Sequence, residues 1–456
     1  MSGFVNLIID ILSEPSVLVG LIAVLGLILQ KKPFTEIITG GIKTFVGFLV
    51  ILAGSDIVSG ALEPFSVMFD EAFELAGVVA KNEAVIAVAL EEYGVATAFI
   101  MLFGMIFNML IARFTRFKYI YLTGHATFYQ SCMMAVILSV AGFTNIPLAI
   151  IGGLIIGIVN SLYPALLQPF MRNITDNDEV ALGHTGSFGF AISGLFGKLV
   201  GGKNSKSTED IDFPKSLAFL RDSTVSMTII MSVIYFILLP FTGLDFVRQE
   251  LSNGTNPFVY SIQQAGTFAA GIFVVLAGVR LVLAEIIPAF RGISEKLVPN
   301  AKPALDCPVI FPFAKNAVMI GFIFGFIGNV LAFFVQILLG TIVIVPGPRF
   351  FSSATAGVFG NSTGGIRGAI LGSLLNGFLM PFFSIILMPL LGQLGFAEST
   401  FSDTDYAVTG IFFGGLGELG GRMAIIIGVV VVLLAMFAIT YFMRGRDNRL
   451  KQQGEL

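Results

Sequence analysis

Residues 126–171 read ATFYQSCMMAVILSVAGFTNIPLAIIGGLIIGIVNSLYPALLQPFM and contain no charged side chain. A helix needs roughly 20 apolar residues to cross about 30 Å of hydrocarbon, so this stretch is long enough for two crossings. It is interrupted at Gly142-Phe143-Thr144-Asn145-Ile146-Pro147, where glycine, asparagine and proline are typical of a turn. The stretch therefore predicts two membrane helices joined by a short connection.

The composition of the whole chain agrees with this interpretation. Of its 456 residues, 55% are hydrophobic and only 12% are charged, and the mean hydropathy is +0.91. A soluble domain carries roughly 25% charged residues, so this chain could not cover a water-exposed surface. The composition excludes a soluble globular enzyme, a disordered protein and a nucleic-acid-binding protein. It predicts an all-α polytopic membrane protein.

Other stretches of spanning length carry few or no charges. They are 17–30, 44–63, 93–112, 223–244, 257–279, 317–348, 368–397 and 423–443. Together with the two crossings in 126–171 they make ten predicted spans, and 407–420 is an ambiguous eleventh. Basic residues, which favour cytoplasmic loops, gather in a polar loop at 201–222 and in a tail at 444–456. We therefore expect an N-terminus outside, a cytoplasmic C-terminus and an odd number of about 11 crossings.

An internal duplication is indicated by matches at a nearly constant offset. The segment from Leu52 to Pro64 reappears from Leu276 to Pro288, an offset of 224 residues, and the same offset places Asn82 over Asp306. We therefore predict a first repeat at 1–200 and a second at 223–443, which includes the last helix. Since five predicted crossings precede the loop at 201–222, the second repeat is inverted, as in many secondary transporters.

Two corresponding segments, 76–92 and 301–316, are too short and too polar to span a membrane. Irregular backbone at membrane depth is tolerated only where protein buries it or where it lines a cavity. We predict a re-entrant hairpin in each segment, which places Asn82, Glu83 and Asp306 at the interface between the repeats. The alternative is that both segments are ordinary polar surface loops; the duplication favours the hairpins.

The chain has only two histidines, and each follows a glycine directly. His125 and His184 both begin predicted helical stretches, whose N-terminal N–H groups favour anionic or hydroxyl-rich ligands. A single histidine near a membrane surface is usually an interfacial residue. The similar Gly-His contexts of these two favour a ligand-binding role. The stretches 352–365 and 414–421, rich in small residues, are expected to serve close helix packing.

Two cysteines, Cys132 and Cys307, form no metal-type spacing, so we expect no metal site and no cofactor. No nucleophile–base–acid set supports a membrane-embedded enzyme or scaffold, which is one of the rival interpretations.

Four short motifs resemble a known family. They are Leu122-Thr123-Gly124-His125, Gly183-His184, Ala304-Leu305-Asp306-Cys307 and Ala314-Lys315-Asn316-Ala317-Val318. In these motifs, and over nearly its whole length, the chain is similar to the ascorbate-type membrane permease, enzyme IIC (EIIC), of the phosphoenolpyruvate-dependent sugar phosphotransferase system.

The resemblance implies a homodimer in the bacterial inner membrane, with 11 transmembrane helices per protomer. Each protomer would have a core domain with two re-entrant hairpins and a V-shaped dimerisation domain, and the core would carry the sugar by an elevator-type motion. The implied ligand positions are Gly54, Ser55, Asn82, Glu83, His125, Tyr129, His184, Thr185 and Asp306.

The implied function is uptake of L-ascorbate or a related hydroxylated, weakly acidic carbohydrate. The chain would not be an enzyme and would have no catalytic residue, because a soluble enzyme IIB (EIIB), charged by an enzyme IIA (EIIA), would phosphorylate the sugar. The other rival is an ion-coupled secondary transporter for a nucleobase or an organic anion, in which Glu83, Asp306 and Glu418 would bind protons or Na⁺.

Overall fold

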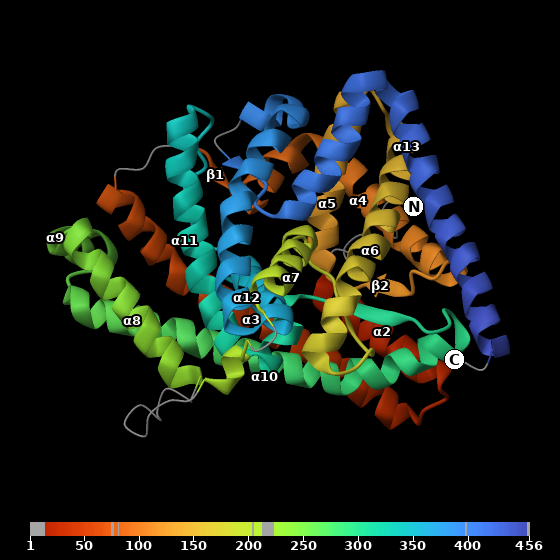
Figure 1. The fold of residues 1–456 in the computed structure, drawn as a ribbon, viewed down its shortest axis with the longest axis horizontal. Helices are drawn as coiled ribbons and strands as arrows, with labels where there is room; N and C mark the ends of the chain where they lie inside the picture. Colours follow the sequence, from red (N-terminus) through yellow and green to blue (C-terminus); the bar gives the residue numbers. More distant parts are fainter. Residues whose placement is uncertain are drawn as a thin grey trace.

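The computed structural model describes residues 14–73, 77–80, 82–202, 205–211, 223–396 and 399–453. Within these ranges the chain is almost entirely helical, as the composition predicts (Figure 1). The helices are α2 (Pro15–Leu29), α3 (Phe34–Phe73), α4 (Asn82–Phe114), α5 (Gly124–Val140), α6 (Asn145–Thr175), α7 (Ser187–Val200), α8 (Ser223–Thr242), α9 (Leu244–Phe246), α10 (Pro257–Lys296), α11 (Lys315–Leu339), α12 (Phe350–Leu387) and α13 (Thr404–Gln453). The short strands are β1 (Val79–Ala80), β2 (Tyr119–Tyr121), β3 (Ala181–Leu182), β4 (Lys302–Leu305) and β5 (Ser399–Thr400), and the short helical segments are η1 (Thr208–Asp210), η3 (Val247–Leu251), η4 (Cys307–Phe313) and η5 (Met388–Phe396).

The length and apolar character of the helices make this a multi-pass membrane protein. In the described part of the chain, seven helices are long and apolar enough to cross a membrane, and an eighth is counted if the bent pair Met227–Thr242 and Leu244–Leu251 forms one span. The seven lie in α3, α4, α6, α10, α11, α12 and α13. The eleven crossings predicted from the sequence include shorter helices such as α2, so the total of eleven stays a prediction.

The predicted break in the stretch 126–171 is confirmed. Helix α5 ends at Val140 and α6 begins at Asn145, and between them Gly142 and Asn145 adopt positive φ angles of 88° and 52°. The ambiguous segment 407–420 is the first part of α13, which breaks at Gly420 and Gly421 before it continues.

The two segments predicted as hairpins have a common construction. Residues 77–80 lead into strand β1, and α4 then begins at Asn82 and continues without a break to Phe114. In the second segment, strand β4 is followed by the 3₁₀ segment η4 and by the start of α11. In the described residues each segment is thus a strand followed by helical turns.

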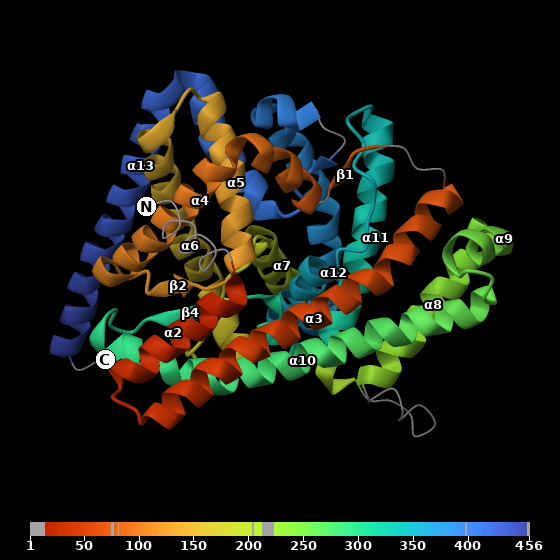
Figure 2. The ribbon, with the colours of Figure 1, turned by 180° about the vertical axis from the view of Figure 1, so that it is seen from behind.

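Helices α2, α3, α8 and α10 form one packed group. Figure 2 shows α3 and α10 lying along each other. They are antiparallel, because Lys43 of α3 pairs with Glu285 of α10 at 3.1 Å, whereas Gly54 lies against Val275. A Cβ at Gly54 would come within 2.6 Å of the Val275 backbone nitrogen, so the glycine permits the close approach of the two helices.

Helices α4, α5, α6, α7, α11, α12 and α13 form the second group, in which α12 packs against both α7 and α11. The prediction that 352–365 serves close packing is confirmed: Gly357 lies against Gly321, and Gly364 lies against Gly197. In the stretch 414–421 the glycines differ. A Cβ at Gly414 would come within 3.1 Å of Leu390 and one at Gly417 within 3.2 Å of Ala141, which agrees with the predicted close packing, whereas a Cβ at Gly415 or Gly421 would meet no atom within 4 Å. Gly415 and Gly421 are therefore not required by helix contacts.

The strands connect the two halves of the sequence. Strand β4, from the second half, lies between β2 and β3 of the first half, and all three are parallel. Strand β1, from the first half, pairs in parallel with β5, and Val78 next to it forms a parallel bridge with Ile344. Each half thus inserts one extended segment between two segments of the other half.

Several predicted regions include residues that the structure does not describe. These are residues 1–13, residues 76 and 81 of the predicted hairpin 76–92, residues 203–204 and 212–222 of the predicted cytoplasmic loop, residue 397 of the predicted span 368–397, and residues 454–456 of the tail. The described part of the loop packs on α11, because the Glu209 carboxylate accepts a hydrogen bond of 2.9 Å from the Asn316 backbone N–H.

Candidate functional site

The three-stranded sheet brings three predicted site residues together. In a parallel sheet the carboxyl ends of neighbouring strands lie at the same edge, where binding sites commonly form. His125 comes after β2, His184 after β3 and Asp306 directly after β4. Residues separated by up to 181 positions in the sequence thereby meet at one edge of the sheet.

Asp306 lies between the two histidines. Its carboxylate oxygens are 3.5 Å from His125 Nε2 and 4.0 Å from His184 Nε2. Oδ1 of Asp306 also accepts a hydrogen bond of 2.7 Å from the Cys307 backbone N–H, which caps η4 and holds the carboxylate in place. A carboxylate held in this way presents its remaining acceptor capacity to a ligand.

The protonation of His184 follows from its local hydrogen bond. Its Nδ1 accepts from the Gly186 backbone N–H at 2.9 Å, so in the neutral ring the proton is on Nε2, which faces Asp306. His125 differs, because its Nδ1 is buried and has no hydrogen-bond partner in the described structure. The His184 side chain is only 10% exposed and that of His125 is 36% exposed, so both rings are held within the protein yet can be reached from a cavity.

A second polar group faces this first group and consists of residues from β1–α4, the start of α12 and the start of α13. The Asn82 amide oxygen accepts from the Ser402 backbone N–H at 2.9 Å, and Arg349 Nη1 donates to the Ser402 carbonyl oxygen at 2.8 Å. The Asp403 carboxylate accepts from the hydroxyls of Thr185 and Ser352 at 2.8 and 2.7 Å. The Thr185 hydrogen bond joins this group to the His184 loop.

The two histidines and the second group line one cavity of about 610 Å³, large enough for a small molecule; Asp306 lies beside it, between the histidines, and is not among its lining residues. Five predicted site residues lie on its surface: Asn82, His125, Tyr129, His184 and Thr185. Helix α3 contributes the polar residues Ser59, Glu63, Ser66 and Asp70 to the lining, together with the apolar Val58, Leu62 and Val67. Polar residues inside an apolar membrane protein commonly mark a substrate path, and the spacing of the four polar residues places them on one side of the helix.

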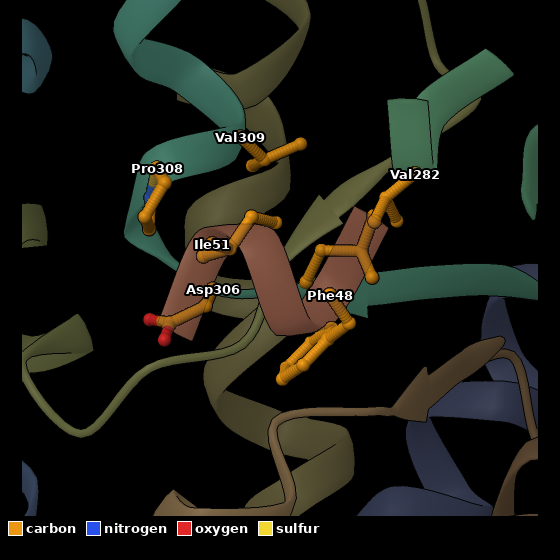
Figure 3. Close-up of a pocket in the computed structure, with 7 residues that line it drawn as sticks. Phe48, Ile51, Val282, Asp306, Pro308 and Val309 are labelled. Carbon is orange, nitrogen blue, oxygen red and sulfur yellow. The ribbon is translucent and has the colours of Figure 1, made fainter. Parts of the chain in front are cut away.

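Asp306 itself borders a small apolar crevice of about 20 Å³, where α3 and α10 meet the β4–η4 segment. Figure 3 shows Phe48, Ile51, Val282, Pro308 and Val309 around it, with the Asp306 carboxylate pointing away from Phe48 and Val282. Apolar side chains thus border Asp306 on one side, and its carboxylate is directed toward the histidines.

The remaining predicted site residues have different positions. Gly54 and Ser55 lie on α3; Gly54 contacts α10, and neither is among the residues that line the 610 Å³ cavity. Glu83 is in the first turn of α4, but its side chain lies outside the described part of the structure. A role for these three residues in ligand binding stays a prediction.

Sequence reasoning missed Arg349, Ser352, Ser402 and Asp403. A usable signal was present for the first of them, because the offset of 224 residues that relates Asn82 to Asp306 also relates His125 to Arg349. The other three lie near the starts of α12 and α13, in stretches without a motif of their own.

One group of potential metal ligands occurs among the described residues. Ligand atoms of His184, Asp306 and Cys307 all lie within 4.8 Å of one another. Coordination through His184 Nε2 would require the loss of its proton, whereas hydrogen bonding to hydroxyl groups uses the atoms as they are arranged. The geometry is thus better suited to a hydroxylated ligand than to a cation.

Comparison with known proteins supplies the broader context. Residues 10–405 match the EIIC-GAT family, described as the PTS system sugar-specific permease component. The chain is also similar to an ascorbate-specific PTS system EIIC component of Mycoplasma pneumoniae (strain ATCC 29342 / M129 / Subtype 1), with 27% identity over 430 residues. The similarity covers 81% of this chain and 64% of that relative, which is less than two thirds of the relative's length.

Proposed function

The chain belongs to the family of sugar-specific permease components of the PTS, and on this basis we propose that it carries L-ascorbate or a related hydroxylated, weakly acidic carbohydrate across the bacterial inner membrane. The observation that carries the proposal is the position of His125, His184 and Asp306 at one edge of the β2–β4–β3 sheet, beside a cavity of about 610 Å³. The His184 Nε2–H would donate to a ligand oxygen, and Asp306 would accept from a hydroxyl.

Coupling to phosphorylation forms the second part of the proposal. Among the described residues, the two histidines and Asp306 are arranged for hydrogen bonding and are not exposed for phosphate transfer from a soluble donor. A separate EIIB, charged by an EIIA, would therefore phosphorylate the sugar on the cytoplasmic side. The described residues of the 201–222 loop form only a short segment against α11.

The third part concerns the motion. We propose that α4–α7 and α11–α13 form a core that moves as an elevator against α2, α3, α8 and α10, in a homodimer of 11-helix protomers with inverted repeats. The interleaved strands support the repeats, because each half contributes one segment between two of the other. The apolar crevice between α3, α10 and the β4–η4 segment supports a boundary there, since its side chains make few polar contacts that a movement would break. Light scattering should give a dimeric mass in lipid, and a clean monomer would contradict the dimer.

One observation favours the rival, ion-coupled function. Glu63, Asp70 and Asp403 line the cavity, whereas Arg349 is the one lysine or arginine among its described lining residues. Excess carboxylate in a membrane cavity is typical of sites that bind protons or cations. Glu418, which was also predicted for this role, is exposed on α13 and does not line the cavity.

Transport into vesicles separates the two functions. The full chain would be reconstituted with radiolabelled ascorbate, in one arm with phosphoenolpyruvate and the soluble phosphotransferase components and in the other with a proton or Na⁺ gradient alone. We expect accumulation of phosphorylated sugar in the first arm and none in the second. Accumulation of free substrate under the gradient alone would reject the phosphotransferase function.

A further inference from the structure

Arg349 lies at a special position in the cavity. It directly precedes α12 and follows the segment Val345-Pro346-Gly347-Pro348, all four residues of which line the cavity. Two prolines with fixed φ angles restrict the backbone of this segment, so the position of the arginine is restrained. Among the described lining residues it is the one side chain that is positively charged at any physiological pH.

The hydrogen-bonding capacity of Arg349 is largely unused. A guanidinium has five N–H donors, and in the described structure this one makes a single hydrogen bond, from Nη1 to the Ser402 carbonyl oxygen. Burial disfavours its charged form, and the Asp403 carboxylate offsets part of this effect at longer range. The remaining donors are available to a ligand in the cavity.

The Asp403 carboxylate does not satisfy these donors. Its two oxygens already accept from the hydroxyls of Thr185 and Ser352 at 2.8 and 2.7 Å. A neutral polyol would offer Arg349 only hydroxyl oxygens. A carboxylate offers two oxygens in the geometry that a guanidinium binds best, and an enolate offers one charged oxygen. Charge-assisted hydrogen bonds are roughly twice as strong as neutral ones.

The carboxylates of the cavity determine the orientation of such a ligand. Glu63 and Asp70 lie on α3, and Asp306 lies with the histidines, so an anionic group placed near any of these would be repelled. Arg349 lines the cavity, whereas Asp306 lies beside it, between His125 and His184. The charge distribution therefore favours a ligand whose hydroxyls contact Asp306 and His184 and whose anionic end contacts Arg349.

We propose that Arg349 binds the anionic group of the transported carbohydrate and thereby selects an acidic sugar over a neutral hexitol. This inference rests on the proposed function, because it assigns the ligand of the same cavity. His125 and Arg349 then occupy positions related by the offset of 224 residues but have different tasks: His125 lies with the groups that recognise hydroxyls, and Arg349 recognises charge.

The test measures binding to the purified full chain in nanodiscs. The probes are L-ascorbate and D-glucuronate, which carry an enolate and a carboxylate, and galactitol, which is neutral. Arg349→Gln should weaken binding of the favoured anion by about 10- to 100-fold and should change galactitol binding by less than about 3-fold. Whichever of the two anions loses more affinity identifies the group that contacts Arg349.

Two further variants make the result specific. Arg349→Lys retains the charge but loses the planar fork, so it should recover part of the anion affinity. Arg367→Gln removes an exposed arginine from the same helix and should change nothing. Thermal unfolding, monitored through the labelling of the buried Cys132 and Cys307, reports whether each variant is folded. If Arg349→Gln is unfolded, the loss of anion affinity in Arg349→Lys tests whether the guanidinium binds the anion.

The outcomes separate this inference from the proposed function. An equal loss for anions and galactitol, or anion binding that Arg349→Gln leaves unchanged, would reject the role of Arg349 while the permease function stands. If the unsubstituted chain binds none of the three carbohydrates, the proposed function itself fails.

Discussion

Asp306 and the two histidines are the clearest residues of the site because the chain has so few others like them. It contains two histidines in 456 residues, and both lie within 4.0 Å of the same carboxylate. Polar residues inside a membrane protein are costly and are kept where they have a function. A carboxylate shared between two imidazoles beside a cavity is therefore a candidate functional site.

Substitution of these residues tests the pocket. His184→Ala and Asp306→Asn should each weaken carbohydrate binding by at least about 10-fold, because each removes a buried donor or a charged acceptor from the ligand. Binding would be measured with radiolabelled ligand in detergent. Glu36→Gln, at an exposed ion pair of α3, is the control and should bind normally. Unchanged affinity in folded His184→Ala would contradict the assignment of the pocket.

Asp178 joins three elements at the end of the sheet. It follows α6, and its carboxylate accepts from Gln168 and Arg172, both at 2.8 Å, and pairs with Lys302 at the start of β4. Burial opposes its ionisation, but the hydrogen bonds from Arg172, Lys302 and Gln168 outweigh burial and lower the pKa of Asp178 to about 2. The ionised form therefore stabilises the connection between α6, β3 and β4.

Measuring stability at acid pH tests the contribution of Asp178 to this connection. Because the pKa of Asp178 in the folded protein is below its ordinary value of 3.8, the stabilisation is present above pH 3.8 and is lost as the pH falls toward 2. Asp178→Asn should lower the Tm by about 1–3 °C at neutral pH, since the group is half-exposed, and the difference should disappear near the lower pH. Asp176→Asn in the same loop is the control. A pH-independent difference would contradict an electrostatic origin.

The close packing of α12 on α11 through glycine gives a second prediction at the scale of the secondary-structure elements. A Cβ at Gly357 would lie 2.4 Å from the Gly321 Cα, between α12 and α11, so Gly357→Ala forces the helices apart. Such overpacking costs about 1–3 kcal/mol. Gly415→Ala meets no atom within 4 Å and should be neutral or stabilising, because alanine favours helix more than glycine. The Tm of each variant would be measured by thermal unfolding. Equal Tm values for Gly357→Ala and Gly415→Ala would contradict the close α11–α12 contact.

The orientation of the whole molecule is a prediction that the fold itself does not test. If the loop at 201–222 and the tail at 444–456 are cytoplasmic, Asp210→Cys and Leu450→Cys should react with an impermeant thiol reagent only after the membrane is opened. The native Cys132 and Cys307 are buried and serve as the internal background. Labelling of either position in intact cells would overturn the orientation.

Features that depend on local chemistry were predictable. The break at Gly142 could be predicted from the residues next to it, and the long apolar helices could be predicted from their composition. The prediction of hairpins at 76–92 and 301–316 used polarity, length and the internal duplication. It could not anticipate that strand pairing with distant segments would give each of them an extended start.

The candidate site was predictable in part, for the same reason. His125, His184 and Asp306 were found because histidines and intramembrane carboxylates are rare in this chain. Ser352, Ser402 and Asp403 have no such distinction, and their importance depends on contacts such as the hydrogen bond between Thr185 and Asp403. Contacts across 218 residues are made by the packed fold and have no local signature.

The sequence by itself determined that this protein is a multi-pass membrane protein and which rare polar residues it has to accommodate, because the cost of polar groups in lipid depends on composition. The tertiary structure alone decided which of them meet. The order β2–β4–β3 places His125, Asp306 and His184 at one edge, and the starts of α12 and α13 bring Arg349 and Asp403 to the other side of the same cavity. Strand order depends on pairing between distant segments, so it follows from the global fold rather than from any single stretch.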